Sequence, residues 1–310
     1  MYFIRCGVIA LSVFFLVYAG LSLLVSAGWR TLHREGRRTS SVAAYGLRIF
    51  PLLAAFVAVV LFTIPSFLRF EPRWDEEPIG IAVLVLAAGG AAILILGMVN
   101  VLRAWMRTRR SVFSWIADSQ ALKLEAAVPA FQTCESAPLL AVAGLRRPKL
   151  LLSGRARQLL DPGELEVAIR HELAHVRRCD NLKKLLLRAC AFPFFGALER
   201  AWLAAAEISA DDDAVQDEQS ALDLASALLK LSRLSPREPS PELAMDLVSG
   251  SPGAVAARVE RLLSWTPHAP RPHRLAGIAL PAVIMAVATI AFSYVSLLDR
   301  VHQLTELLVR

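Results

Sequence analysis

The stretch DPGELEVAIRHELAHVRR, residues 161–178, holds the most informative local pattern in the chain. Asp161 can cap a helix, a proline follows in the first turn, and Glu164 occupies the capping-box position, so the stretch predicts a helix. His171 and His175 then lie one turn apart on the same face of that helix. Two imidazoles at this spacing can reach one zinc ion with their ring nitrogens.

Glu172 completes the pattern H-E-x-x-H. It is too close in sequence to His171 to be a third ligand on the same face, but it is well placed to take a proton from a metal-bound water. The pattern is short enough to arise by chance on a helix. Its position inside a well-capped helix favours the metal site.

A catalytic zinc site needs one more protein ligand and an open position. The first histidine after His175 is His268, so a histidine ligand shortly downstream is excluded. Glu207, in AAAEISADDDAV on a predicted helix 197–218, is the best remaining candidate, because the alanines around it let two helices approach closely. The alternative is a solvent-exposed glutamate beside an acidic surface patch at 211–213.

Three further acidic residues bear on this site. Asp211 lies one turn after Glu207 and can accept a hydrogen bond from the far nitrogen of a ligand imidazole. Asp180 and Glu199 are weaker candidates for the third ligand, and Asp180 is predicted to cap the helix that follows it.

Four apolar stretches are long enough to cross a bilayer. The chain has 310 residues, is 55% apolar and has a mean hydropathy of +0.49, which is typical of a membrane protein. The stretches are 7–27, 49–68, 79–102 and 275–298. They contain no Asp, Glu, Lys, Arg or His, which argues against a proton pump or an ion-coupled transporter.

The arginines predict the orientation of these stretches. The loop 28–48 has five arginines and one acid, whereas the loop 69–78 has four acids and two arginines. Residues 28–48 and 103–274 are therefore predicted to be cytoplasmic, and both termini extracytoplasmic. The net charge of +7 follows from the same arginines, and no basic, aromatic-interleaved module that would indicate nucleic-acid binding is present.

These patterns together predict an α+β fold in a polytopic membrane protein with four transmembrane helices. Three helices occupy residues 1–102, a cytoplasmic domain occupies 103–274, the fourth helix is 275–298, and 299–310 is a short extracytoplasmic tail. Within the domain, short apolar runs between 121 and 153 predict strands. Helices are predicted near 181–193, 197–218, 220–234 and 253–265, with a loop at 235–241.

Three segments resemble the BlaR/MecR-type antirepressor metallopeptidases, which are membrane zinc proteases with a cytoplasmic gluzincin domain between their third and fourth helices. The segments are PLLAVAGLRRPKLLLS at 138–153, LDPGELEVAIRHELAHVRRCDNL at 160–182, and AAEISADDDAV at 205–215. The resemblance implies that Glu172 is the catalytic base and Asp211 a second-shell residue, and that Zn²⁺ is bound by His171, His175 and Glu207. It also implies that the strand near 139–143 or 149–153 is a sheet edge, to which an extended substrate adds as a strand.

The function implied by the resemblance is cleavage of a cytoplasmic protein at the bacterial cytoplasmic (inner) membrane, in signal transduction. A BlaI-like winged-helix repressor is the candidate substrate, and the lipid bilayer is the other partner, with no direct nucleic-acid contact. The best-known members carry a penicillin-binding sensor after the fourth helix, whereas this sequence ends twelve residues beyond it. The signal is therefore expected from a separate sensor protein, the outer loop or the bilayer.

One departure from the family pattern and two alternative functions remain. The segment AFPFFGALERAW, 191–202, lacks the aromatic-His-Pro signature of relatives, which affects the substrate cleft more than the zinc ligands. One alternative function is membrane-protein quality control by an HtpX-like protease, although such proteases usually place membrane helices between the two motifs. The other is a non-catalytic transducer or scaffold that uses zinc only structurally.

Overall fold

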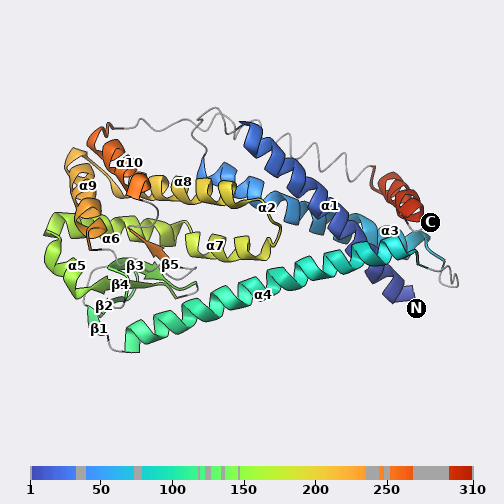
Figure 1. Ribbon diagram of the computed structural model, residues 1–310, viewed down its shortest axis with the longest axis horizontal. Coiled ribbons are helices and arrows are strands. Elements are labelled where there is room, and N and C mark those ends of the chain that lie inside the picture. Colours follow the sequence, from blue (N-terminus) through green and yellow to red (C-terminus); the bar gives the residue numbers. More distant parts are fainter. Residues whose placement is uncertain are drawn as a thin grey trace. The chain divides into compact units, whose positions relative to one another are not determined.

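A computed structural model describes most of the chain, and Figure 1 shows its elements in sequence colours. The described residues are 2–32, 40–72, 79–117, 119–122, 127–133, 137–145, 147–234, 244–247, 252–267 and 293–308. The chain divides into two compact units. Unit 1 comprises Met1–Glu35, Leu47–Leu96 and His268–Arg310, and unit 2 comprises Gly36–Gly46 and Gly97–Pro267.

Three long apolar helices match the first three predicted spans. The first is α1 (Tyr2–Leu32) and the third is α4 (Ile81–Ala117). The second is continuous from Ser41 to Phe70 and consists of α2 (Ser41–Val57), the π-helical segment η2 (Ala58–Thr63) and α3 (Ile64–Phe70). Each is long and apolar enough to cross a membrane. α4 has 37 residues, which at 1.5 Å per residue is well beyond the roughly 30 Å of a bilayer core. The expected domain boundary at 102/103 therefore lies inside one continuous helix.

The fourth predicted span, 275–298, lies mostly outside the described residues. Residues 293–308 are helical, so helix reaches into the segment expected as a tail. Within unit 1 this helix is held to α3, because the Ser66 hydroxyl donates to the Leu298 carbonyl at 2.7 Å. α1 and α4 are joined in the same way, because the Ser12 hydroxyl donates to the Val83 carbonyl at 2.8 Å.

Unit 2 contains a five-stranded sheet in the order β1-β2-β4-β3-β5. β2 and β4 are parallel, and the other neighbouring pairs are antiparallel. The strands are β1 (Gln120–Leu122), β2 (Ala130–Thr133), β3 (Leu140–Ala143), β4 (Lys149–Ser153) and β5 (Ala244–Asp246).

Six helices of unit 2 follow β4, and several of them share one core with the sheet. They are α5 (Gly154–Leu159), α6 (Pro162–Arg177), α7 (Asp180–Ala189), α8 (Gly196–Ala214), α9 (Glu218–Ser232) and α10 (Pro252–Leu263). Successive strand residues point to opposite faces of a sheet. Leu150 and Leu152 therefore join the core of α6 and α9, whereas Leu151 packs against the end of α4. Both faces of β3 and β4 are thus covered.

One expectation about the sheet is wrong. The strand near 139–143 or 149–153 was expected at an open edge, but β3 and β4 are both interior. β5 pairs with β3 in antiparallel register, with Met245 opposite Val142, and the edge belongs to β5. A three-residue strand about a hundred residues along the chain from its partner carries no pattern of its own, and for this reason β5 was not predicted. The four-residue β2 lies within the segment 121–153 that was predicted to form strands, although between the apolar runs that indicated them. The loop predicted at 235–241 lies outside the described residues.

Candidate metal centre

The start of α6 is fixed by polar contacts that anchor the whole helix. The backbone N–H of Asp161 donates to Glu164 Oε2 at 2.9 Å, which completes the predicted capping box. The buried Glu164 carboxylate also accepts from Lys230 Nζ on α9 at 2.7 Å. The helix register, and with it the face that carries the two histidines, is set by these contacts.

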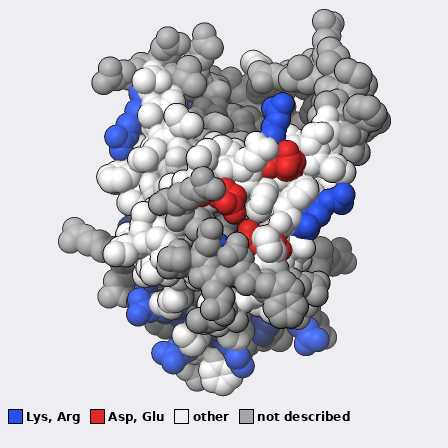
Figure 2. All heavy atoms as spheres, turned by 90° about the vertical axis from the view of Figure 1, so that its right-hand side faces the viewer, with Lys and Arg blue, Asp and Glu red and all other residues white. Residues whose placement is uncertain are grey.

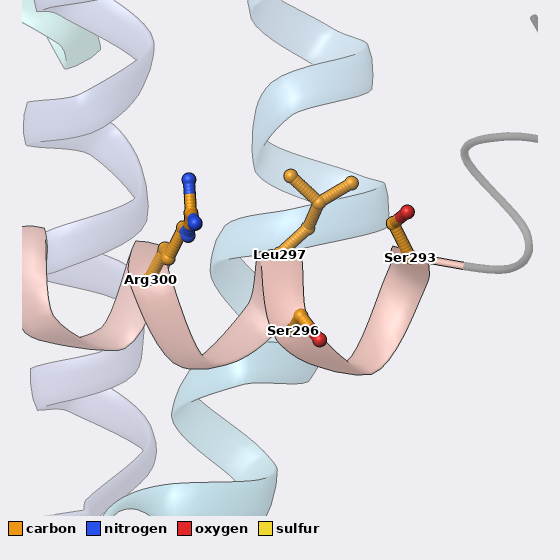
Figure 3. Close-up of a pocket in the computed structure, with 4 residues that line it drawn as sticks. All are labelled: Ser293, Ser296, Leu297 and Arg300. Atoms are coloured by element: carbon orange, nitrogen blue, oxygen red, sulfur yellow. The ribbon is translucent and has the colours of Figure 1, made fainter.

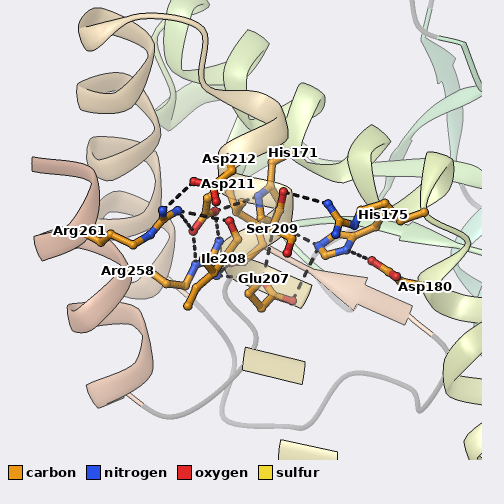
Figure 4. Close-up of polar contacts among 12 residues, drawn as sticks. His171, His175, Asp180, Glu207, Ile208, Ser209, Asp211, Asp212, Arg258 and Arg261 are labelled. Carbon is orange, nitrogen blue, oxygen red and sulfur yellow. Dashed lines mark hydrogen bonds and ion pairs between the residues drawn. The ribbon is translucent and has the colours of Figure 1, made fainter. Parts of the chain in front are cut away.

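His171 and His175 lie with their Nε2 atoms 3.2 Å apart, and both side chains are buried. A carboxylate lies beside each remaining ring nitrogen: Asp211 Oδ1 is 3.0 Å from His171 Nδ1, and Asp180 Oδ2 is 2.9 Å from His175 Nδ1. A hydrogen bond at Nδ1 fixes the tautomer that leaves the Nε2 lone pair available to a metal. The two Nε2 atoms therefore lie side by side and are both available to one ion, with Asp211 and Asp180 on the other sides of the rings (Figure 4).

Glu207 on α8 completes a group of three buried residues that could hold a metal ion. Its carboxylate oxygens lie 3.6 Å from His171 Nε2 and 3.7 Å from His175 Nε2. Tetrahedral ligands about 2.0–2.1 Å from zinc are separated by roughly 3.3 Å, which the 3.2 Å between the two Nε2 atoms matches. The two distances from Glu207 involve different oxygens, Oε2 to His171 and Oε1 to His175, and are a few tenths of an ångström longer. α8 approaches α6 closely because its inner face carries Ala206 and Ala210, both buried.

Arg258 on α10 is a central part of this site that sequence reasoning missed. Its Nε and Nη2 donate to the two oxygens of Asp211 at 2.9 and 2.7 Å, and its Nη1 lies 3.0 Å from Glu207 Oε2. The signal was present in the sequence. Arg258 follows the buried Val255 and precedes Val259 and Leu262 on the apolar face of α10, and a charged residue at such a position needs a buried partner.

The charges of the site are strongly coupled. Burial alone would lower the pKa of His171, but hydrogen bonds to Asp211 and Glu207 raise it to about 9. Burial alone would raise the pKa of Glu207, but the Arg258 charge and the two histidines lower it to about 2. Asp211 is likewise held ionised, chiefly by Arg258. The Glu207 and Asp211 carboxylates thus lie beside Arg258, with Arg261 a further 3.8 Å from Asp211, and they favour a positive charge at the histidines, either a proton or a metal ion.

Metal uptake is expected to tighten as pH rises toward about 9. An ion must displace the proton of His171, so below that pKa the apparent affinity should rise about tenfold per pH unit and then level off. Competition with a chelator across pH values would measure it, corrected for the chelator's own protonation. Asp211→Asn should make the affinity level off at a lower pH, because it removes a main support of the raised pKa of His171. A pH-independent affinity would contradict the coupling.

Glu172 is fully buried on α6, and its Oε2 accepts the backbone N–H of Val142 on β3 at 3.0 Å. Asn181 on α7 donates to the Val142 carbonyl at 3.1 Å, so side chains from α6 and α7 bind the two backbone polar groups of one residue of β3. Lys184, also on α7, lies within electrostatic reach of Glu207, Asp180 and Glu172, and burial is the main cause that lowers its pKa. Lys184 was not predicted as part of the site.

The role expected for Asp180 needs correction. It was predicted as a helix cap and a weaker ligand candidate, but Cys179 occupies the N-cap position with a left-handed φ of 55°, and no side-chain cap bond forms there. That turn carries Asp180 back to the Nδ1 of His175. Glu199, the other weaker ligand candidate, pairs instead with Arg188 at 3.4 Å.

Asp180→Asn is expected to weaken metal binding by about 10–100-fold, because the carboxylate that orients His175 and raises its basicity is lost. The fold should persist, since asparagine retains the shape of the side chain. Titration of the metal-free chain with zinc would measure the affinity. Asp213→Asn is the matched control, because Asp213 lies on α8 and its exposed carboxylate pairs with Arg178. Equal affinity of both variants and wild type would refute the orienting role.

The first turn of α2 lies against α8 within unit 2. Ser41 Oγ is 3.4 Å from Ser209 Oγ, two residues beyond the glutamate of the metal group. Arg178 joins them: its Nη2 donates to Ser41 Oγ at 3.3 Å, and its Nη1 donates to the Ser209 carbonyl at 3.2 Å. The rings of Tyr45 and Trp202 meet one turn further along, with centroids 5.9 Å apart.

A model of a known protein family matches more than half of the chain. The model of the BlaR1 peptidase M56 family covers residues 70–262, from the end of α3 to α10. Every residue assigned above to the candidate centre lies within this range. No curated protein matches the chain.

Proposed function

From the chain's membership of the BlaR1 peptidase M56 family, we propose that it is a membrane-embedded zinc-dependent endopeptidase with His171, His175 and Glu207 as ligands. The observation that carries this is the convergence of two imidazole Nε2 atoms, 3.2 Å apart, on a buried glutamate. Each of these imidazoles is oriented by its own carboxylate. Such buried preorganisation supports a resident ion rather than an incidental histidine pair.

A zinc ion bound there would polarise the carbonyl of the scissile peptide and make a bound water more acidic. The protein's own part in the reaction falls to Glu172. Its carboxylate takes the proton of the attacking water and then gives it to the leaving amine. The Val142 N–H, bonded to Oε2, holds the carboxylate in one orientation throughout. Asp211 and Asp180 keep both ligand imidazoles in the required tautomer.

The proposed substrate is a cytoplasmic protein, with a BlaI-like repressor as the leading candidate. Support for the cytoplasmic side comes from the arginines that flank unit 2 in sequence, which favour the inner face of a bacterial cytoplasmic membrane. The inducing signal would come from a separate sensor protein, the outer loop or the bilayer. A substrate that adds to the sheet as a strand would pair with β5, or would take its place beside β3.

The test is a comparison of protein N-termini in native-host cells that carry either wild type or Glu172→Gln at equal expression. A cleaved transcriptional regulator found only with wild type supports the proposal and identifies the target. Scattered fragments of membrane proteins found only with wild type would favour quality control instead. Identical N-termini in both strains under inducing conditions, with the phenotype retained in Glu172→Gln, would favour the scaffold and refute peptidase function.

A further inference from the structure

A further group of potential metal ligands lies in unit 1 and shares no residue with the centre in unit 2. Among the described residues, Glu71, His302 and Glu306 place one ligand atom each within 4.8 Å of one another, and all three residues are half-buried. The proposed peptidase chemistry makes no use of them.

Two of these residues share a helix. His302 and Glu306 are four positions apart in the helix 293–308, so their side chains project from the same face. The Phe70 ring stacks on the imidazole of His302, with centroids 5.6 Å apart and planes at 30°, which restricts how the imidazole can turn. The spacing is thus the same one-turn arrangement that supports metal binding by the two histidines of α6.

Glu71 comes from a different element and is held rigidly. It ends α3 with extended backbone, and its N–H donates to the Phe67 carbonyl at 3.0 Å. Arg5 Nη2 on α1 lies 3.2 Å from Glu71 Oε1, and only 9% of the Arg5 and 6% of the Glu71 side chain are exposed. A carboxylate that is oriented by a buried guanidinium also occurs in unit 2, where Arg258 holds Glu207.

The charges near this group favour a cation. Two carboxylates and one imidazole lie together here, and the Arg5 guanidinium pairs with the Glu71 carboxylate. The Glu306 carboxylate comes in addition to that ion pair. Figure 2, which looks at the end of the molecule where the C-terminus lies in Figure 1, shows acidic side chains close together near the middle of that face, with basic side chains around them. One imidazole and two carboxylates form a donor set that suits zinc-class divalent ions better than magnesium or calcium.

A pocket on the same helix, 293–308, is lined by a different face of that helix. It is lined by Ser293, Ser296, Leu297 and Arg300 (Figure 3). These positions recur at three- and four-residue intervals, and at about 100° per residue His302 lies roughly 160° round the helix axis from Arg300. The basic side chain of the pocket therefore belongs to another face of the helix than His302 and Glu306.

We propose that Glu71, His302 and Glu306 form a second divalent-metal site, which binds a transition-metal cation of the zinc class. A bound ion would tie the end of α3 to the helix 293–308, beside the start of α1. The contacts already present, from Ser66 to Leu298 and from Leu308 to the apolar cluster of Cys6 and Phe67, bring the ligands together before the ion arrives. This inference does not depend on peptidase activity.

The experiment counts zinc ions per chain by elemental mass spectrometry, on the full chain in lipid nanodiscs after dialysis against buffered Zn²⁺. The parent variant carries His171→Ala with His175→Ala, which removes the centre in unit 2. It should retain about one ion per chain, and adding His302→Ala should remove that ion. Gln303→Ala is the matched control, because Gln303 is exposed on the same helix and bonds only to Asp299 among the described residues.

If the His171→Ala/His175→Ala variant does not fold, zinc ions per chain are counted instead in chains that keep both histidines. There His302→Ala should lower the number of bound zinc ions by one, and Gln303→Ala should leave it unchanged. A double variant that folds and binds no zinc would overturn the proposal. So would an ion that survives His302→Ala combined with Glu306→Gln. Since the readout is bound metal, a chain without peptidase activity could still confirm this site, and an active chain could still refute it.

Discussion

Glu172→Gln is expected to slow cleavage of the chain's protein substrate by about 10²–10⁴-fold, the usual contribution of a general acid–base residue. Bound zinc should stay at the wild-type level, because the three proposed ligands are unchanged. Glutamine keeps the size of the side chain, and its carbonyl oxygen can still accept the Val142 N–H that Glu172 Oε2 accepts at 3.0 Å. What is lost is the capacity to take a proton from water.

The measurement is the rate of substrate cleavage by purified chain at matched zinc content. Glu166→Gln is the matched control: it lies on the same helix, its side chain is 73% exposed, and its partner Arg170 is 3.8 Å away. That variant should cleave at the wild-type rate. A Glu172→Gln chain that holds zinc and cleaves at the wild-type rate would remove Glu172 from the mechanism and leave the proton transfer to another group.

Arg258→Ala is expected to destabilise the metal-free chain by about 3–5 kcal/mol, the range for removal of one partner from a buried ion pair. The substitution leaves the Asp211 and Glu207 carboxylates buried without their guanidinium, which now lies 2.7 Å and 3.0 Å from them. The loss should be smaller in the zinc-loaded chain, because the ion neutralises Glu207. Lysine should restore stability only in part, since it cannot donate to both Asp211 oxygens in the planar geometry of arginine.

Thermal and denaturant unfolding of the chelator-treated and zinc-loaded chains would measure both effects. Arg170→Ala on α6 is the control, because the Arg170 guanidinium lies 3.8 Å from Glu166, whose side chain is 73% exposed. An exposed pair of this kind contributes about 0–1 kcal/mol. Equal losses in the two variants would mean that burial of the Arg258 pair is not what stabilises the site.

The local parts of the site were predictable because their signals are local. The capping box and the one-turn histidine spacing lie within a single helix, and the alanines around Glu207 indicated where a second helix could come close. The structure brings His171, His175 and Glu207 together, with Asp211 beside His171. Their roles as zinc ligands and supporting carboxylate stay predictions until metal binding is measured.

What sequence reasoning missed depends on contacts between distant segments. Arg258 meets Asp211 from another helix, and β5 meets β3 from about a hundred residues away in sequence. Asp180 was misjudged because a left-handed turn at Cys179, which L-residues seldom adopt, reverses its direction. The three apolar helices followed from composition and length alone, whereas most of the fourth predicted span lies outside the described residues.

The contact between the first turn of α2 and α8 has a mechanical consequence. α2 runs from Ser41 to Val57 as one helix with Pro51 inside it, so a shift of its apolar part along the helix axis would also move its first turn. Hydrogen bonds of 3.3–3.4 Å, such as those of Ser41 to Arg178 and Ser209, are lost after a displacement of about 1 Å. A displacement of α2 along its axis by less than the rise of one residue would therefore break these contacts. The helix that carries Glu207 would lose part of its support.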